Sequence, residues 1–279
     1  MSQQRSATVT ALTIAGSDPS GGAGIQADMK AMSALGAYAM SVITALTAQS
    51  TRGVAGVHAV PVDFVRLQMD TLLEDIVPDA TKIGMLATVE LADAVGEYLP
   101  GLTHTVLDPV MVATSGDRLL APEAEKAVRE LCSRADVITP NLKELAVLTQ
   151  TEEATDLDRA IEVAKAWAAE ADTAVIVKGG HLDSPIADNA VVTPDGKVHR
   201  VESARVQTKN THGTGCSLSS ALATRLGAGD DAATALEWST DWLHEAIANA
   251  DALGVGDAHE LHERAREYGR EQGMRADAL

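Results

Sequence analysis

Short apolar segments alternate with longer amphipathic segments along most of the chain, and this alternation restricts the possible folds more than any other feature. The apolar segments have the length of buried strands and lie at residues 9–15, 39–46, 82–86, 105–107, 137–139 and 174–177. The amphipathic segments have helical periodicity and lie at residues 24–35, 62–76, 89–98, 122–132, 142–148 and 156–170. Such alternation predicts βαβ units and an α/β fold, with a central, mainly parallel sheet flanked by helices.

The last third of the chain departs from this pattern without dividing it into domains. Residues 187–193 and 197–201 are separated by Pro194-Asp195-Gly196, which predicts a small antiparallel hairpin. Helices are expected at residues 214–226 and 232–253, followed by a polar helical tail at 258–272. No linker or repeat interrupts the chain, so we expect one domain over residues 1–279, with a core at about 8–253 and a tail at 254–279.

The charge of the chain excludes some classes of partner. Forty acidic residues against 22 Lys and Arg give a formal net charge of −18, which argues against nucleic acid or an anionic membrane as a partner. A surface rich in carboxylates also predicts solubility in concentrated salt, as in a halophilic protein, although an acidic protein of an ordinary cytoplasm fits as well.

The cysteine content and the apolar runs predict a cytoplasmic protein. Cys132 and Cys216 are far apart in sequence and form neither a disulfide framework nor a CxxC metal site. No run approaches the roughly 18 apolar residues of a membrane span. The first seven residues are polar and do not resemble a secretion signal.

One glycine-rich segment combines a possible anion site with a possible base. His212-Gly213-Thr214-Gly215-Cys216 precedes the helix expected at 214–226, and the N–H groups and dipole of a helix N-terminus favour phosphate. The same field is expected to lower the pKa of the Cys216 thiol and make it a thiolate. The structural alternative is a tight turn followed by a small buried cysteine.

A second glycine-rich segment follows the first predicted strand, at the edge where an open parallel sheet binds its ligands. The segment from Gly16 to Gly24 allows close approach of the backbone to a ligand, but it is not a Walker loop because no Gly-Lys-Ser/Thr follows. Gly22-x-Gly24-x-x-Ala27 formally matches the dinucleotide fingerprint of a nicotinamide-dependent dehydrogenase. The glycines come late after the strand, and the next strand ends at Gln49 and not at an acidic residue, which disfavours that alternative.

Polar side chains follow four other predicted strands. The carboxamide of Gln49 matches the amino group and adjacent ring nitrogen of an aminopyrimidine, unless it is simply a loop residue. Asp108 and Glu144 could hold Mg²⁺, partly through water, although a helix dipole alone would explain Glu144. Lys178 lies between an apolar strand and two glycines, where its ammonium either meets an anion or extends to solvent.

These segments, in this order, resemble the ribokinase-like superfamily and, within it, the hydroxymethylpyrimidine and phosphomethylpyrimidine kinases of thiamine biosynthesis. The resemblance covers about residues 8–253. It rests on TIAGSDPSGGAGIQAD at 13–28, SVITALTAQ at 41–49, KIGML at 82–86, DPVM at 108–111, TPNL at 139–142, KGGH at 178–181 and NTHGTGC at 210–216. It implies a three-layer fold and a homodimer.

The resemblance also implies roles for individual residues of an enzyme that uses ATP and Mg²⁺. Gln49 would bind the pyrimidine, with further substrate contacts at Gly16, Ala23, Asp28 and Met85. Asp108 and Glu144 would help to hold Mg²⁺, and Asp108, Asn141, Lys178 and Thr208 would contact the nucleotide. Gly213, Thr214 and Gly215 would form the anion hole beside Cys216, the expected base, with Lys178 also catalytic. The enzyme would phosphorylate first the alcohol and then its monophosphate, the second with help from Lys178 and the loop at 20–24.

Two alternatives remain within this resemblance. A pyridoxal or pyridoxine kinase would use a related pocket, although a pyridine lacks the aminopyrimidine edge that Gln49 would read. A non-catalytic ligand sensor on the same fold is disfavoured by the presence of Asp108, Glu144, Lys178 and Cys216.

The C-terminal segment departs from the family pattern. The family usually ends with Gly-His-Gly and a proline-containing segment, whereas this chain has GVGDAHELH at 254–262. His259 and His262 have a spacing that could bind a metal, but two histidines on a charged helix are more often only solvated.

Overall fold

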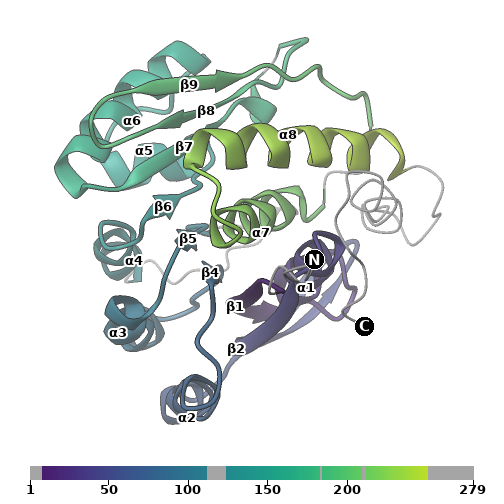
Figure 1. Cartoon of the computed structure of the whole chain (residues 1–279), viewed down its shortest axis with the longest axis vertical. Helices are drawn as coiled ribbons and strands as arrows, with labels where there is room; N and C mark the ends of the chain where they lie inside the picture. Colours follow the sequence, from purple (N-terminus) through teal and green to yellow (C-terminus); the bar gives the residue numbers. More distant parts are fainter. Residues whose placement is uncertain (1–7, 112–123, 183, 209–211, 251–279) are drawn as a thin grey trace, which may run out of the picture.

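A single mixed sheet organises the protein. The computed structural model describes residues 8–111, 124–182, 184–208 and 212–250. In this part of the chain nine strands form one sheet in the order β3-β2-β1-β4-β5-β6-β7-β8-β9. Figure 1 shows α1, α7 and α8 on one side of the sheet and α3 and α4 on the other. The predicted α/β fold with helices on both faces is therefore confirmed.

Six neighbouring strands are parallel, as the alternating pattern predicts. Most of their residues are buried, which explains why they read as continuous apolar runs. β4 begins earlier than the predicted strand at 82–86. It also ends earlier, because the strand stops before Gly84. The parallel strands are β1 (Thr10–Ser17), β2 (Tyr38–Ser50), β4 (Ala80–Ile83), β5 (Thr105–Leu107), β6 (Val137–Ile138) and β7 (Ala174–Lys178).

The antiparallel strand β3 (Gly53–Ala59) was not expected from the sequence. It pairs with β2, which continues to Ser50 and so extends beyond the predicted end at residue 46. The residues of β3 are half-buried or exposed, so they lack the apolar alternation that marks a strand. Hydrogen bonding to β2 therefore determines this strand.

The predicted hairpin is confirmed at the other edge of the sheet. β8 (Asn189–Val192) pairs antiparallel with both β7 and β9 (Val198–Val201). The turn is closed by hydrogen bonds between Thr193 and both Gly196 and Lys197. Gly196 has φ of +80°, a conformation that glycine adopts without strain.

The helices agree with the predicted segments within a few residues, and several begin at side-chain caps. Thr88, Asn141, Asp156 and Asp231 each accept a hydrogen bond from a backbone N–H of the first turn. The predicted tail at 258–272, with His259 and His262, lies outside the described residues. The α-helices are α1 (Gly24–Ala34), α2 (Val62–Leu73), α3 (Val89–Tyr98), α4 (Glu125–Cys132), α5 (Leu142–Thr149), α6 (Leu157–Ala171), α7 (Thr214–Gly227) and α8 (Ala232–Ala248).

Two apolar layers hold the helices to the sheet. One lies between the sheet and α2 to α6, and the other is formed mainly by α1, α7 and α8. α7 packs across β1, β4 and β5, and its residues from 217 to 224 are all buried. This packing places the N-terminus of α7 at the carboxyl edge of the parallel strands.

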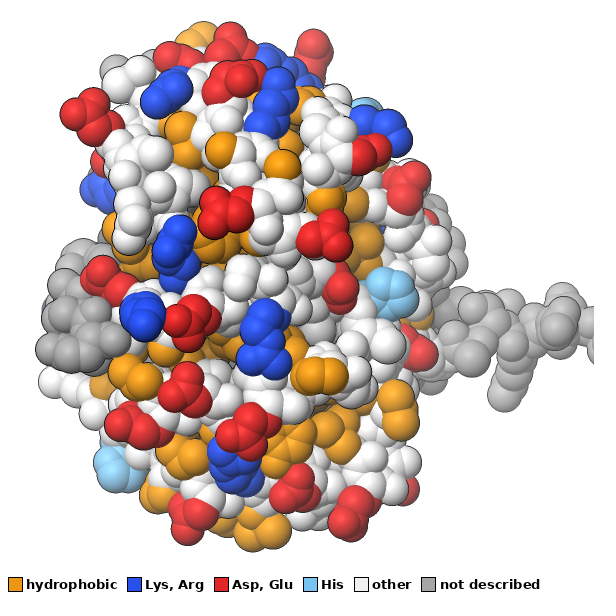
Figure 2. Space-filling view, turned by 90° about the vertical axis from the view of Figure 1, so that its left-hand side faces the viewer, with side chains coloured by type: hydrophobic (Ala, Val, Ile, Leu, Met, Phe, Trp, Pro, Cys, Tyr) orange, Lys and Arg blue, Asp and Glu red, His pale blue; other side chains and the backbone are white. Residues whose placement is uncertain are grey.

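The outer surface is polar and mixed in charge. On the side of the molecule where α3 and α4 lie, acidic and basic side chains are interspersed, with apolar side chains between them (Figure 2). None of the helices in the described part of the chain combines the length and apolar composition needed to cross a membrane.

Candidate active site

The loops that follow β1, β4, β5, β6 and β7 meet the N-terminus of α7, and this edge of the sheet is the candidate active site. Gly213 is the N-cap of α7, with φ of +77°. A Cβ atom built on Gly213 would lie 1.7 Å from the carbonyl oxygen of Gly22. Only glycine fits there, so the two glycine-rich segments singled out in the sequence are in direct contact.

A side-chain contact between His212 and Asp18 joins the same two loops. His212 Nε2 lies 3.1 Å from Asp18 Oδ2. Asp18 also accepts hydrogen bonds from the backbone N–H groups of Ser20 and Ala23. Burial alone would raise the pKa of Asp18, but the hydrogen bonds from His212 and Ser20 lower it to about 2. Asp18 therefore holds the loop after β1 as a buried carboxylate.

Asp108 and Lys178 meet beneath the first turn of α7. Lys178 Nζ lies 3.4 Å from Asp108 Oδ1, and the Thr139 hydroxyl donates to the same oxygen at 3.0 Å. A Cβ atom on Gly215 would lie 3.7 Å from Asp108 Oδ2 and 3.8 Å from Lys178 Nζ. The glycine backbone of the predicted anion hole is thus adjacent to this pair. The ammonium of Lys178 thus pairs with a carboxylate of the protein and does not extend to solvent, and its contact with a bound anion stays a prediction.

Glu144 is a second carboxylate in this cluster, and it can both cap α5 and help to hold Mg²⁺. Its side chain accepts from Asn141 N, while Asn141 Oδ1 accepts from Glu144 N, so the two residues form a capping box at the start of α5. Burial, with a further contribution from Asp108, raises the pKa of Glu144 to about 7, although Lys178 opposes the shift. A negative charge at Glu144 is therefore incompletely balanced by the protein.

The predicted thiolate at Cys216 is wrong for the protein without ligands. Cys216 occupies the first turn of α7, but burial and the charges of Asp28 and Asp108 raise the pKa of its thiol to about 11. Lys82 and the backbone of Gly24 act in the opposite direction without reversing the shift. Burial is the largest cause of this shift, and the two carboxylates add to it.

Four of the residues expected to contact the substrate lie at the carboxyl edge of the sheet, and one does not. Gly16 and Met85 are adjacent, since a Cβ atom on Gly16 would lie 3.2 Å from Met85 Sδ. Gln49 is half-buried near the end of β2, and its Oε1 accepts from the Thr47 hydroxyl at 3.2 Å. Ala23 is half-buried at the N-cap of α1. These four residues lie at the ligand-binding edge.

Asp28 does not lie at this edge. Its side chain is fully buried, and it pairs with Lys82 and accepts hydrogen bonds from Thr13 and Ser220. The expected contact with substrate is therefore not available in this structure. Thr208 is half-buried between β9 and α7, and residues 209–211 lie outside the described part.

Several residues that build the site were not singled out by the sequence analysis. Asp18 and His212 clamp the loops, Thr139 orients Asp108, and Lys82 lies buried near Cys216. A lysine within an otherwise apolar strand was the available signal for Lys82, because an unpaired ammonium is costly in a core. Nothing local distinguishes Thr139 from an ordinary strand residue.

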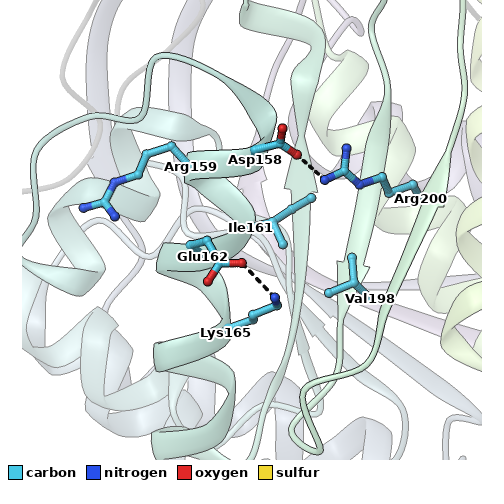
Figure 3. A pocket seen from close by; sticks show the side chains of 7 residues that line it. All are labelled: Asp158, Arg159, Ile161, Glu162, Lys165, Val198 and Arg200. Carbon is cyan, nitrogen blue, oxygen red and sulfur yellow. Dashed lines mark hydrogen bonds and ion pairs between the residues drawn. The ribbon is translucent and has the colours of Figure 1, made fainter.

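A separate surface hollow lies between α6 and β9, away from this edge. Asp158, Arg159, Ile161, Glu162, Lys165, Val198 and Arg200 line it (Figure 3). Asp158 pairs with Arg200 and Glu162 pairs with Lys165. The charges that line the hollow are thus largely matched within the protein.

Comparison with known protein families matches residues 18–262 to the phosphomethylpyrimidine kinase family. This chain belongs to that family. A thiamine biosynthesis multifunctional protein of Corynebacterium efficiens is 55% identical over 91% of the chain. A hydroxymethylpyrimidine/phosphomethylpyrimidine kinase of Escherichia coli is 46% identical, over 91% of this chain and 98% of that protein.

The two corynebacterial relatives are longer proteins. This chain spans about a third of their length, 34% and 32%.

Solved structures of two kinds of kinase have the same fold. A Bacillus subtilis pyridoxal kinase in complex with ADP has a TM-score of 0.84 at 31% identity, covering 94% of this chain and 100% of the other. The Clostridium difficile phosphomethylpyrimidine kinase has a TM-score of 0.75 at 38% identity, covering 86% and 100%. The fold of the family is therefore the ribokinase-like fold that the resemblance implied.

Proposed function

We propose that this chain transfers the γ-phosphoryl group of ATP to hydroxymethylpyrimidine and then to its monophosphate, as a step of thiamine biosynthesis. The observation that carries the proposal is that Gly215, in the α7 turn that also holds Cys216, lies beside Asp108 and Lys178 at one edge of the sheet. Membership of the phosphomethylpyrimidine kinase family and the named E. coli relative support the substrate.

The site offers electrostatic stabilisation for phosphoryl transfer. The backbone N–H groups at the start of α7 and the Lys178 ammonium would surround the oxygens of the transferred group. The hydroxymethyl oxygen forms the new bond to phosphorus, the bond to ADP breaks, and the hydroxyl proton passes to Cys216 Sγ. Because the thiol pKa is about 11 without ligands, neutralising the charge of Asp108 is part of making Cys216 a base.

The carboxylates fit a magnesium ion. Asp108 and Glu144 supply hard oxygen ligands, and the raised pKa of Glu144 reflects negative charge that Lys178 alone does not balance. Mg²⁺ usually binds one or two carboxylates together with phosphate oxygens and water, so a larger ligand set is unnecessary. When bound, the ion would neutralise charge on the nucleotide phosphates. Asn141 and Thr208 would contact the nucleotide.

The second phosphorylation requires a place for a substrate that already carries phosphate. Lys178 and the N–H groups of residues 20–24 are the proposed donors. Gln49, Gly16 and Met85 would hold the pyrimidine, with Gln49 pairing with its amino edge. Asp28 is proposed to act from beneath the site, where it holds Lys82.

Pyridoxal kinase activity is the second candidate function. One Staphylococcus aureus pyridoxal kinase, in complex with AMP-PCP and pyridoxal, has a TM-score of 0.81 at 29% identity and covers 91% of this chain. A hydroxymethyl-pyridine offers the same alcohol to Cys216 but lacks the aminopyrimidine edge. A ligand sensor without activity is a third candidate, disfavoured by the assembled charged residues.

We further propose a homodimer that acts in the cytoplasm and tolerates concentrated salt. The net charge of −18 supports the last property, and the family resemblance supports the first.

The test is phosphoryl transfer from Mg-ATP, with products identified by mass. Hydroxymethylpyrimidine, its monophosphate and pyridoxal are offered separately, in buffers from low salt to molar KCl. Turnover of both pyrimidines supports the two-step kinase. Turnover of pyridoxal alone moves the chain to vitamin B6 salvage. Binding without product at every salt concentration supports a sensor.

A further inference from the structure

A fully buried ion pair lies beneath the candidate site. Lys82 Nζ is 2.9 Å from both carboxylate oxygens of Asp28, and neither side chain is exposed. The hydroxyls of Thr13 and Ser220 donate to Asp28 at 2.6 and 2.8 Å. The pair therefore joins β1, α1, β4 and α7 in one hydrogen-bonded network.

The network lies under the turn of α7 that carries Cys216. Ser220 follows Cys216 by four residues, so the two side chains share one face of the helix. Lys82 reaches this face from β4, on which α7 packs. A Cβ atom on Gly84 would lie only 2.8 Å from Lys82 Nζ, so the chain leaves room for the ammonium at the end of β4.

Stability does not by itself account for this pair. Removing two charges from water is costly, and apolar replacement of a buried pair is often neutral or stabilising. The position of the pair beside a nucleophilic side chain offers another reason for it, because an ammonium favours a nearby anion.

We propose that Lys82, held by Asp28, is a positioning residue whose positive charge favours the Cys216 thiolate during phosphoryl transfer. The inference rests on the proposed function, because it assigns Lys82 to the step in which Cys216 takes the hydroxyl proton. Lys82 acts through Cys216 and does not touch the substrate.

The charges around Cys216 support this role. Lys82 lowers the pKa of the thiol and is the largest influence after burial, followed by Asp28 and Asp108, which raise it. Burial alone would lower the pKa of Lys82, but Asp28, Cys216 and Asp108 raise it above its usual value. Lys82 therefore stays protonated over the range in which the thiol ionises.

The test measures ionisation of Cys216 directly in the protein without substrate. The rate of carbamidomethylation of Cys216 by iodoacetamide is followed by peptide mass spectrometry as a function of pH. The main variant is Lys82→Met, which removes the ammonium, and Lys82→Met/Asp28→Asn is the second variant, for use where Lys82→Met does not fold. Lys165→Met, on the exposed face of α6, is the matched control, and buried Cys132 serves as an internal reference.

We expect alkylation of Cys216 in folded Lys82→Met to be about 3- to 10-fold slower near pH 8, as its thiol pKa rises. The double variant should be slower by less, because the loss of Asp28 partly offsets the loss of Lys82. The control should match the parent protein. The parent's pH profile in folded Lys82→Met, or in the double variant where Lys82→Met does not fold, would overturn the proposal, since a purely structural pair leaves the thiol unchanged. Failure of the proposed function is distinguishable, because absent kinase turnover leaves this alkylation profile unaffected.

Discussion

Replacing Glu144 with Gln is expected to stabilise the protein while removing magnesium-dependent activity. Gln serves in a capping box as Glu does, so Glu144→Gln keeps the start of α5 and removes only the charge. The pKa of Glu144 is raised from its usual 4.5 to about 7 by burial and by Asp108. A shift of this size corresponds to roughly 3 kcal/mol of free energy of unfolding.

The direction of the pH dependence follows from the raised pKa. The neutral form of Glu144 is favoured in the folded state, so its contribution to stability is complete below pH 4.5. It is lost as the pH rises through about 7. Because Gln mimics the neutral form, the variant and the parent should be similar near pH 5. Above pH 7 the variant should be more stable by about 3 kcal/mol.

Urea unfolding of parent and variant between about pH 5 and pH 9 measures this difference. Glu130→Gln, at an exposed position of α4, is the control and should leave the pH dependence of the parent. Mg²⁺ should stabilise the parent above pH 7 and have little effect on Glu144→Gln. Equal pH dependence in parent and Glu144→Gln, or a variant that is less stable at pH 8, would refute the argument.

Four other changes test the rest of the site. Gly213→Ala should abolish turnover and lower the free energy of unfolding by about 1 to 3 kcal/mol. Gly196→Ala is the control, because Gly196 has a similar φ but nothing within 4 Å of an added Cβ. It should lower the free energy of unfolding by less. Gln49→Leu should lower kcat/KM for the pyrimidine far more than for pyridoxal, and equal losses would remove Gln49 from the pocket. Cys216→Ala should keep ATP binding by calorimetry but lose most turnover, so near-normal turnover would exclude it as the base. Asp18 should contribute stability above pH 3.8 that is lost as the pH falls through about 2, so acid unfolding of Asp18→Asn should lack this component.

The parts of the fold that the sequence predicted are those that burial determines. Buried strands such as β1 and β7 read as apolar runs, and Thr88, Asp156 and Asp231 mark helix starts through local caps. β3 was missed because its partly exposed residues owe their conformation to hydrogen bonds with β2. The composition of a single strand does not predict which strand it pairs with.

The candidate site was predicted in its members better than in its electrostatics. Asp108 and Lys178 could be placed together because parallel strands end at one edge of a sheet. The ionisation state of Cys216 could not be predicted in this way. The helix N-terminus is local in sequence, whereas the carboxylates that raise the thiol pKa come from α1 and the end of β5. The inward direction of Asp28 likewise depends on Lys82, 54 residues away.

The contact between Gly22 and Gly213 has a consequence for synthesis of the chain. β4 and β5 lack the cover of α7 on one face until this helix has left the ribosome, because α7 begins only at Thr214. The proposed anion site cannot form in any N-terminal fragment that stops before this helix, however well its strands pair. Apolar surface on that face stays exposed to chaperones or to aggregation during most of translation. The candidate active site is thus completed late in synthesis.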